Sequence, residues 1–355
     1  MKTILITGGA GFVGAHLALA LKRHREDTRV LAFDNLKRRG AELSLARLRA
    51  GGVEFVHGDV RCWADLEGVG GIDALIECSA EPSVLAGFGD APNYLLDTNL
   101  GGALNCLELA RRHAAAFVFL STSRVYPIRA LSGLLHSEAE TRFELAPEQI
   151  VAGASADGIN ENFPLAGARS LYGATKLSAE IVLQEYAAMY GMPAVIDRCG
   201  VLTGPWQMGK TDQGVIVLWA ARHCYGGSLQ YIGYGGTGKQ VRDILHIGDL
   251  TDLVLRQLDH IADYRGEIFN VGGGRPVSVS LLELTGLCEQ LTGKSIPITS
   301  TAEKRPADIP LYLSDTGKVR AACNWQPRRG VEETLEEIVR WLRDEESALR
   351  GILAP

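Results

Sequence analysis

The stretch Thr3-Ile4-Leu5-Ile6-Thr7-Gly8-Gly9-Ala10-Gly11-Phe12-Val13-Gly14 decides the fold of this chain. Its first five residues form a compact apolar run that is typical of a buried strand, and residues 12–22 then follow a helical pattern. Glycines suit the junction because a tight turn, a closely approaching pyrophosphate and a close helix–strand contact all exclude a Cβ. The helix N-terminus adds free N–H groups and a partial positive charge. The stretch therefore predicts a dinucleotide phosphate site formed by Gly8, Gly11, Phe12, Val13 and Gly14.

An acidic residue follows at the spacing that such a site requires. Asp34 ends the second apolar run, 20 residues after Gly14 (34 − 14 = 20). A carboxylate there accepts hydrogen bonds from the adenosine ribose hydroxyls and repels a 2′-phosphate, which favours NAD over NADP. Lys37, Arg38 and Arg39 follow closely. They either face solvent or accommodate a phosphate, so they weaken the preference for NAD.

Short apolar runs alternate with helical patterns through the first half of the chain. Strands are predicted at 3–7, 30–33, 53–56, 74–76, 117–120 and 194–197. Helices are predicted at 12–22, 42–49, 94–113 and 172–189. This alternation indicates an α/β fold, a doubly wound parallel sheet of the Rossmann type.

Two later regions depart from this rhythm. Residues 128–169 have weak periodicity and are expected to form a long irregular excursion, which in a compact domain is often functional. After about residue 199, glycine-marked turns surround short strands, and helices are predicted at 250–258, 281–291 and 331–342. We expect residues 1–199 to form the dinucleotide-binding domain and residues 200–355 a smaller α/β substrate lobe. A strand near 268–271 is expected to return to the first domain.

Composition excludes several classes of protein. A net charge of −6 over 355 residues predicts no general attraction to nucleic acid or to an anionic membrane. No run approaches the roughly 20 apolar residues that span a bilayer, and glycines interrupt the only candidate signal peptide. The seven cysteines are odd in number and none has metal-knuckle spacing, so we expect buried thiols and no metal site. The absence of both signals, a bilayer span and a signal peptide, predicts a cytoplasmic protein.

Residues that follow the other predicted strands lie beside the cofactor in such a sheet, because ligands bind at the carboxyl ends of parallel strands. Asp59 is a candidate for the adenine edge, and an N-cap for the helix that follows is an equally good reading. The remaining expected cofactor contacts are Asn35, Val60, Ser79, Ala80 and Asn99.

A proton-transfer pair is predicted on the helix at 172–189. Tyr172 and Lys176 are four residues apart and therefore share one helix face. A nearby ammonium and a positive nicotinamide ring both favour the phenolate, so Tyr172 becomes a usable base at neutral pH. Thr122 follows a predicted strand and is a third candidate, whereas turn formation is the better reading for Ser121 and Ser123.

These motifs together resemble the extended short-chain dehydrogenase/reductase family of nucleotide-sugar epimerases and dehydratases. The resemblance covers nearly the whole chain and implies that Thr122, Tyr172 and Lys176 are catalytic. The 4,6-dehydratases of the family resemble one another in an Asp-Glu pair after that threonine, where this chain has Ser123 and Arg124. Elimination of water then has no obvious acid and base, so the resemblance favours epimerisation.

Longer motifs are similar to the CDP-paratose 2-epimerase branch of that family. They are Glu81-Pro82-Ser83-Val84, Gly204-Pro205-Trp206-Gln207, Asp212-Gln213-Gly214 and the stretch from Gly238 to His246. The resemblance implies a CDP-sugar, inversion of carbon 2 through a keto-sugar, and a homodimer paired through the helices at 94–113 and 172–189. The substrate contacts that it implies are Glu81, Ser123, Arg124, Gln213, Arg242 and Arg305.

Several alternatives stay open at this stage. Arg242 and Arg305 suit bidentate hydrogen bonds to a pyrophosphate. The alternative for each is a solvated arginine on the surface. The reaction could instead be a 4-epimerisation or a net dehydrogenation that releases NADH. A protein of another class, a cofactor sensor or RNA-associated protein without chemistry, is less favoured because the tyrosine–lysine pair is present.

Overall fold

The computed structural model describes residues 1–210 and 213–354. The chain divides into two compact units. The first comprises Met1–Val125, Ser170–Arg198 and Leu250–Phe269, and the second comprises Tyr126–Arg169, Cys199–Asp249 and the chain from Asn270 onward. The observed division therefore differs from the boundary expected at residue 199 in two places. The excursion, within Tyr126–Arg169, belongs to the second unit, and Leu250–Phe269, a helix with part of a strand, belongs to the first.

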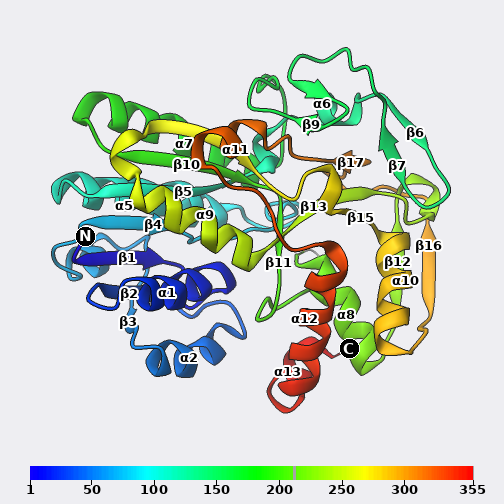
Figure 1. Ribbon diagram of the computed structural model, residues 1–355, viewed down its shortest axis with the longest axis horizontal. Helices are drawn as coiled ribbons and strands as arrows, with labels where there is room; N and C mark the ends of the chain where they lie inside the picture. Colours follow the sequence, from blue (N-terminus) through cyan, green and yellow to red (C-terminus); the bar gives the residue numbers. More distant parts are fainter. Residues whose placement is uncertain (211–212, 355) are drawn as a thin grey trace. The chain divides into compact units, whose positions relative to one another are not determined.

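The first unit is built on a sheet that, within the described residues, has seven strands in the order β14-β10-β5-β4-β1-β2-β3. Neighbours from β3 to β5 pair in parallel. The order reverses between β1 and β4, which is the position where ligands bind in doubly wound sheets. Figure 1 shows the alternation of strand and helix from β1 in blue to β5 in cyan. The strands are β1 (Thr3–Thr7), β2 (Arg29–Asp34), β3 (Glu54–His57), β4 (Ala74–Glu77), β5 (Ala116–Thr122), β10 (Ala194–Cys199) and β14 (Arg265–Val271).

Helices cover the sheet because each presents an apolar stripe to it. They are α1 (Phe12–His24), α2 (Ser44–Ala50), α3 (Trp63–Glu67), α4 (Asn93–Leu96), α5 (Gly102–Arg112), α7 (Leu171–Tyr190) and α9 (Ile247–Asp259). On one face, strand residues such as Leu75 and Phe117 share a single buried core with Leu107 of α5 and Leu183 of α7. The predicted doubly wound α/β sheet is confirmed, including the returning strand β14.

The helix predicted at 94–113 is interrupted. A π-helical turn, Asp97–Gly101, separates α4 from α5. Adjacent glycines at 101 and 102 weaken helix propensity there, and the wider turn buries Thr98 and Asn99. Such π-bulges occur frequently at functional sites.

The second unit has a small sheet around β13 (Val241–His246), which pairs with β11 (Val201–Thr203), β15 (Ser278–Ser280) and β17 (Leu311–Tyr312). A parallel pair, β12 (Leu229–Ile232) and β16 (Ile298–Thr301), lies apart from that sheet. Asp243 of β13 is fully buried, and its Oδ2 accepts hydrogen bonds from the N–H groups of Gly274 and Ser314 at 3.1 Å. The helices of this unit are α8 (Val215–Tyr225), α10 (Leu281–Thr292), α11 (Gly317–Cys323), α12 (Val331–Asp344) and α13 (Glu346–Leu353).

Two parts of the second unit differ from the sequence prediction. Residues 128–169 hold a short helix, α6 (Ile128–Ser132), and two hairpins, β6 (His136–Glu138) with β7 (Phe143–Leu145) and β8 (Ala154–Ser155) with β9 (Gly158–Ile159). These elements are too short to give a period. Helix α8 was not predicted, because its apolar residues surround the helix and leave no polar face to mark it.

Within the described part of the chain, no helix is long and apolar enough to cross a membrane. A cytoplasmic location stays a prediction. Three of the cysteines, Cys106, Cys199 and Cys288, are buried, whereas Cys62 is exposed.

Candidate functional site

The glycine loop between β1 and α1 is shaped by the absence of side chains. Gly8 has φ +62°, and a Cβ on it would lie 2.8 Å from the carbonyl oxygen of Cys78, beyond the end of β4. A Cβ on Gly14 would lie 2.2 Å from the carbonyl oxygen of Gly8. Gly9, which the sequence left without a role, packs so closely on β2 that a Cβ would lie 2.5 Å from the Cα of Ala32. The first turn of α1 carries no acidic residue, so its N–H groups and dipole suit a pyrophosphate.

Asp34 lies beside this loop at the end of β2. Its carboxylate accepts hydrogen bonds from the N–H of Ala10 at 3.1 Å and of Leu36 at 2.7 Å. Burial raises the pKa of Asp34, and the backbone hydrogen bonds oppose that rise. The structure thus brings the acid and the glycine loop together, as a ribose-binding carboxylate requires. Lys37 does not project alone into solvent, because its ammonium lies 4.1 Å from the ring centroid of Tyr94.

Asp59 lies next to Asn35, whose Nδ2 donates to its carboxylate at 2.9 Å. The guanidinium of Arg61 binds the same carboxylate at 2.7 Å and lowers the pKa of Asp59. The reading of Asp59 as a helix N-cap is wrong: α3 begins after Cys62, and no side chain caps it. Asp59 instead closes a short turn by accepting from the N–H of Arg61.

The π-helical turn holds the loop that follows β4. Asn99 is buried there, and its Oδ1 accepts from the N–H of Glu81 at 2.8 Å. Its Nδ2 donates to the carbonyl of Glu81 at 3.1 Å and to Thr175 Oγ1 at 3.4 Å. Asn99 therefore ties Glu81, a predicted substrate contact, to α7. The side chain of Val60 packs into the core.

Helix α7 carries the predicted proton-transfer pair. It begins after Ser170, whose hydroxyl accepts from the N–H of Gly173 at 3.2 Å. Tyr172 is half-buried and Lys176 is only 2% exposed. The helix packs against β5 and against the 3₁₀ turn Ser123–Val125. Thr122 ends β5 at that contact, so the three predicted catalytic residues lie in the same unit.

The hydroxyl of Thr122 is buried and oriented. Its Oγ1 accepts a hydrogen bond from the N–H of Arg124 at 3.2 Å. A hydroxyl that accepts one hydrogen bond can still donate its own proton to a second group. Ser123 and Arg124 form the 3₁₀ turn, which confirms the turn reading for Ser123.

Two buried ionic contacts of α7 were missed by the sequence reading. Lys176 Nζ lies 3.0 Å from Oε2 of Glu77, the last residue of β4. One turn later, Glu180 receives the guanidinium of Arg198 at 2.7 Å and the hydroxyl of Ser121. Reading Ser121 as a turn residue is therefore wrong, because it lies inside β5. The available signal was a charged residue directly after a predicted strand, Glu77 after 74–76 and Arg198 after 194–197.

The predicted substrate contacts of the second unit cluster in part. The guanidinium of Arg242 in β13 lies 3.2 Å from Asp308 Oδ1 and 2.8 Å from the carbonyl of Ile309. Asp308 N–H donates to the carbonyl of Arg305 at 3.2 Å, so both arginines meet at one turn. Gln213 forms a bridge with Lys210. Asp212 of the same motif lies outside the described residues.

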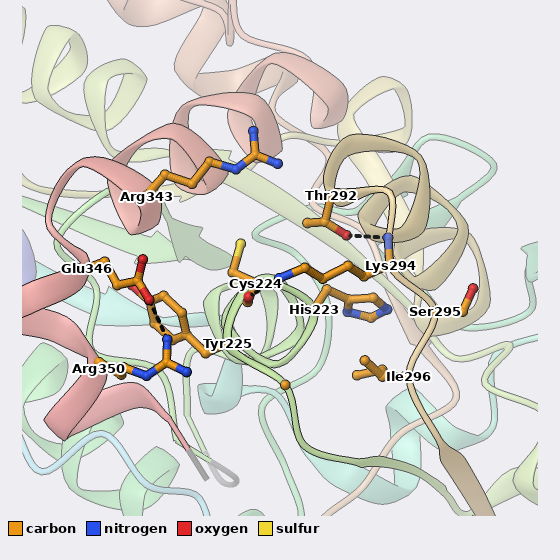
Figure 2. Close-up of a pocket in the computed structure, with 11 residues that line it drawn as sticks. His223, Cys224, Tyr225, Thr292, Lys294, Ser295, Ile296, Arg343, Glu346 and Arg350 are labelled. Atoms are coloured by element: carbon orange, nitrogen blue, oxygen red, sulfur yellow. Dashed lines mark hydrogen bonds and ion pairs between the residues drawn. The ribbon is translucent and has the colours of Figure 1, made fainter.

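The second unit also contains a cavity of about 550 Å³ beside α8, α10 and α13. Figure 2 shows Lys294 reaching across it toward α8, where its Nζ donates to the carbonyl of Cys224 at 2.6 Å. Arg350 pairs with Glu346 at its rim. The predicted substrate contacts Arg242, Arg305 and Gln213 are not among the lining residues, so the cavity is not assigned to the substrate.

Comparison with known proteins finds relatives among nucleotide-sugar epimerases and dehydratases. Residues 4–272 match the NAD dependent epimerase/dehydratase family. The chain is 30% identical to a CDP-paratose 2-epimerase of Salmonella typhi, over 95% of this chain and 98% of the relative. It is 26% identical to a UDP-glucose 4-epimerase of Erwinia amylovora, over 96% and 97%. A crystal structure of a dTDP-glucose 4,6-dehydratase double mutant from Streptomyces venezuelae with NAD bound has a TM-score of 0.79 and 26% identity, covering 99% of this chain and 100% of that one.

Proposed function

The chain belongs to the NAD dependent epimerase/dehydratase family, and we propose that it is a nucleotide-sugar epimerase that inverts carbon 2 of a CDP-sugar. Its cofactor is NAD, which suits the glycine loop and the carboxylate of Asp34. The CDP-paratose 2-epimerase of Salmonella typhi supports the substrate, because its likeness extends over nearly the whole of both chains. The observation that carries the proposal is the placement of Tyr172 one turn before the buried Lys176 on α7.

The residues of this chain supply the proton transfers. NAD, held by the glycine loop and Asp34, would supply the acceptor and the donor for hydride at the sugar carbon. Tyr172 removes the proton of the sugar hydroxyl and later returns it, and the ammonium of Lys176 favours the phenolate that this requires. Thr122 donates a hydrogen bond to the same sugar oxygen, since its Oγ1 already accepts from Arg124.

The turn after β5 supports epimerisation over dehydration. Elimination of water needs an acid and a base close to the sugar. Positions 123 and 124 hold a serine and an arginine in the 3₁₀ turn. These two side chains cannot serve as an acid and a base at neutral pH. Glu81, Ser123, Arg124 and Gln213 are proposed to contact the substrate. Arg242 and Arg305 are proposed to bind its diphosphate, for which guanidinium groups are well suited.

The test is direct observation of the sugar. Purified protein is incubated with CDP-paratose in deuterated water and followed by NMR. The expected result is an equilibrium mixture of carbon 2 epimers without deuterium at that carbon. If the protein inverts only UDP-glucose, at carbon 4, the chain is a 4-epimerase. If it releases NADH in stoichiometric amounts, it is a dehydrogenase. NAD binding without turnover of any nucleotide sugar would indicate a binding protein.

Tyr172→Phe tests the catalytic assignment. Loss of the base is expected to lower turnover by about 100-fold or more, while NAD remains bound. Tyr186→Phe is the matched control, because it removes another phenol from the same helix. It should keep normal turnover. Near-normal activity of Tyr172→Phe would remove the assignment.

We further propose a homodimer formed through α5 and α7, which pack against each other. Large apolar side chains are exposed on these helices, with Ile181 55%, Met189 68% and Leu104 36% accessible. Exposed apolar residues grouped on two adjacent helices are typical of a subunit interface. The two helices from each subunit would form a four-helix contact.

A further inference from the structure

The pair formed by Glu77 and Lys176 has an unusual location. The two side chains are 1% and 2% exposed, and their Nζ and Oε2 atoms are 3.0 Å apart. Glu77 is aligned with Thr7 of β1 on one side and with Phe119 of β5 on the other. The ammonium of Lys176 also lies 4.1 Å from the ring centroid of Phe119. A carboxylate thus occupies the end of an otherwise apolar sheet face.

Such a carboxylate needs a partner. Transfer of an unpaired carboxylate into an apolar core is strongly unfavourable, and a hydrogen-bonded cation offsets that cost. Core residues such as Leu75 and Phe117 precede it on the same face of the sheet. Lys176 is the cation in contact with it, and this lysine stands one turn after Tyr172. The pairing links the charge of a strand residue to the proposed catalytic base.

We propose that Glu77 is a positioning residue of this reaction, whose carboxylate fixes the ammonium of Lys176 at the end of β4 and sets the net charge that Tyr172 faces. This inference rests on the roles proposed for Tyr172 and Lys176. With Glu77 ionised, the pair is nearly neutral in sum. Without that negative charge, the ammonium would act on the phenol uncompensated.

Two thiols lie close enough to the pair for its charges to affect their pKa values. Burial raises the pKa of the Cys78 thiol, just after β4, and of the Cys106 thiol on α5, and the negative charge of Glu77 raises both further, so both stay neutral. Burial alone would lower the pKa of Lys176, but the charges of Glu77 and Tyr172 outweigh burial and leave it raised. Burial likewise raises the pKa of Glu77, against the attraction of Lys176.

The sign of the effect follows from electrostatics. A negative charge raises the pKa of every titratable group near it, so its removal lowers them. Glu77→Gln keeps a hydrogen-bond acceptor for Lys176 but removes the charge. The pKa of Tyr172 and that of Lys176 should therefore both fall. The larger fall is expected for Lys176, because its ammonium is in direct contact with Glu77.

The pH profile of the holoenzyme tests the inference. In Glu77→Gln, both limbs of the kcat/KM profile for the CDP-sugar should move to lower pH, whereas Glu77→Asp should keep the position of the limbs. Glu180→Gln is the control, because it breaks an equally buried ion pair of α7 two turns beyond Tyr172. It should lower thermal stability without moving either limb.

A second readout is independent of turnover. The near-ultraviolet pH titration of the NAD-bound protein, minus that of Tyr172→Phe, isolates one phenol among ten. The same difference measured in the Glu77→Gln background should titrate at lower pH. Unmoved limbs together with an unmoved phenol would reduce Glu77 to a structural residue, and an upward shift would contradict the inference outright. If no nucleotide sugar turns over, the proposed function fails, and the phenol titration alone decides the role of Glu77.

Discussion

Gly14→Ala should weaken NAD binding by displacing the glycine loop. The added Cβ would lie 2.2 Å from the carbonyl oxygen of Gly8 and 2.8 Å from the Cα of Gly9. Non-bonded heavy atoms settle about 3.5 Å apart, so the carbonyl of Gly8 must move by roughly 1 Å. That movement misaligns N–H groups directed at the pyrophosphate. Loss of one hydrogen bond to a charged group is worth about 1.5–3 kcal/mol, which corresponds to about 10- to 100-fold in Kd.

Calorimetric titration of NAD into protein stripped of the cofactor measures this effect. Gly71→Ala is the matched control. Gly71 belongs to the same unit, and a Cβ added there would meet nothing within 4 Å. The control should bind NAD normally. Unchanged affinity in Gly14→Ala, with the protein folded, would refute the phosphate site, because the steric conflict involves backbone atoms that cannot rotate away.

Two further expectations concern stability and assembly. Burial raises the pKa of Asp197 to about 7, so the folded protein holds a proton that the unfolded chain releases above about pH 4. The contribution of Asp197 to the free energy of unfolding should therefore fall by about 1.4 kcal/mol per pH unit between about pH 4 and 7, on top of the contributions of other groups. Asp197→Asn keeps an acceptor for Gln257 and should lack this slope in urea unfolding, whereas parallel slopes would contradict the linkage. Ile181→Glu places a charge on the proposed dimer face and should give monomers by light scattering, and an intact dimer would exclude that face.

Local rules were sufficient for the first part of the site. The apolar run, the glycine spacing and Asp34 are all set by neighbours within one strand–turn–helix unit, and the structure has them where the sequence predicts. Tyr172 and Lys176 were found in the same way, because four-residue spacing fixes a helix face. The doubly wound parallel sheet was predicted from the alternation of strands and helices.

Long-range contacts were beyond those rules. Asp59 was read equally as a cap, because a side chain that accepts from its own turn has the same local sequence as one that caps a helix. Ser121 was read as a turn residue, since its partner Glu180 lies 59 residues away. The prediction of β4 ended at residue 76, because a carboxylate resembles a boundary until its cation is known. Helix α8 gave no periodic signal for the opposite reason, because its residues from Val215 to Ala221 are all apolar.

The missed charges share one physical role on α7. Lys176 and Glu180 are adjacent on one helix face and have opposite charge. The first binds Glu77 at the end of β4, and the second binds Ser121 of β5 and Arg198 of β10. An apolar contact tolerates small slips of a helix along a sheet, whereas two buried ion pairs of opposite polarity do not, because a slip would leave buried charges unpaired. The axial position and rotation of α7 are thereby fixed against three strands. Tyr172 lies one turn earlier on the same helix, so the two ion pairs fix its position as well. A fixed position makes a half-exposed phenol at a helix start suitable for proton transfer.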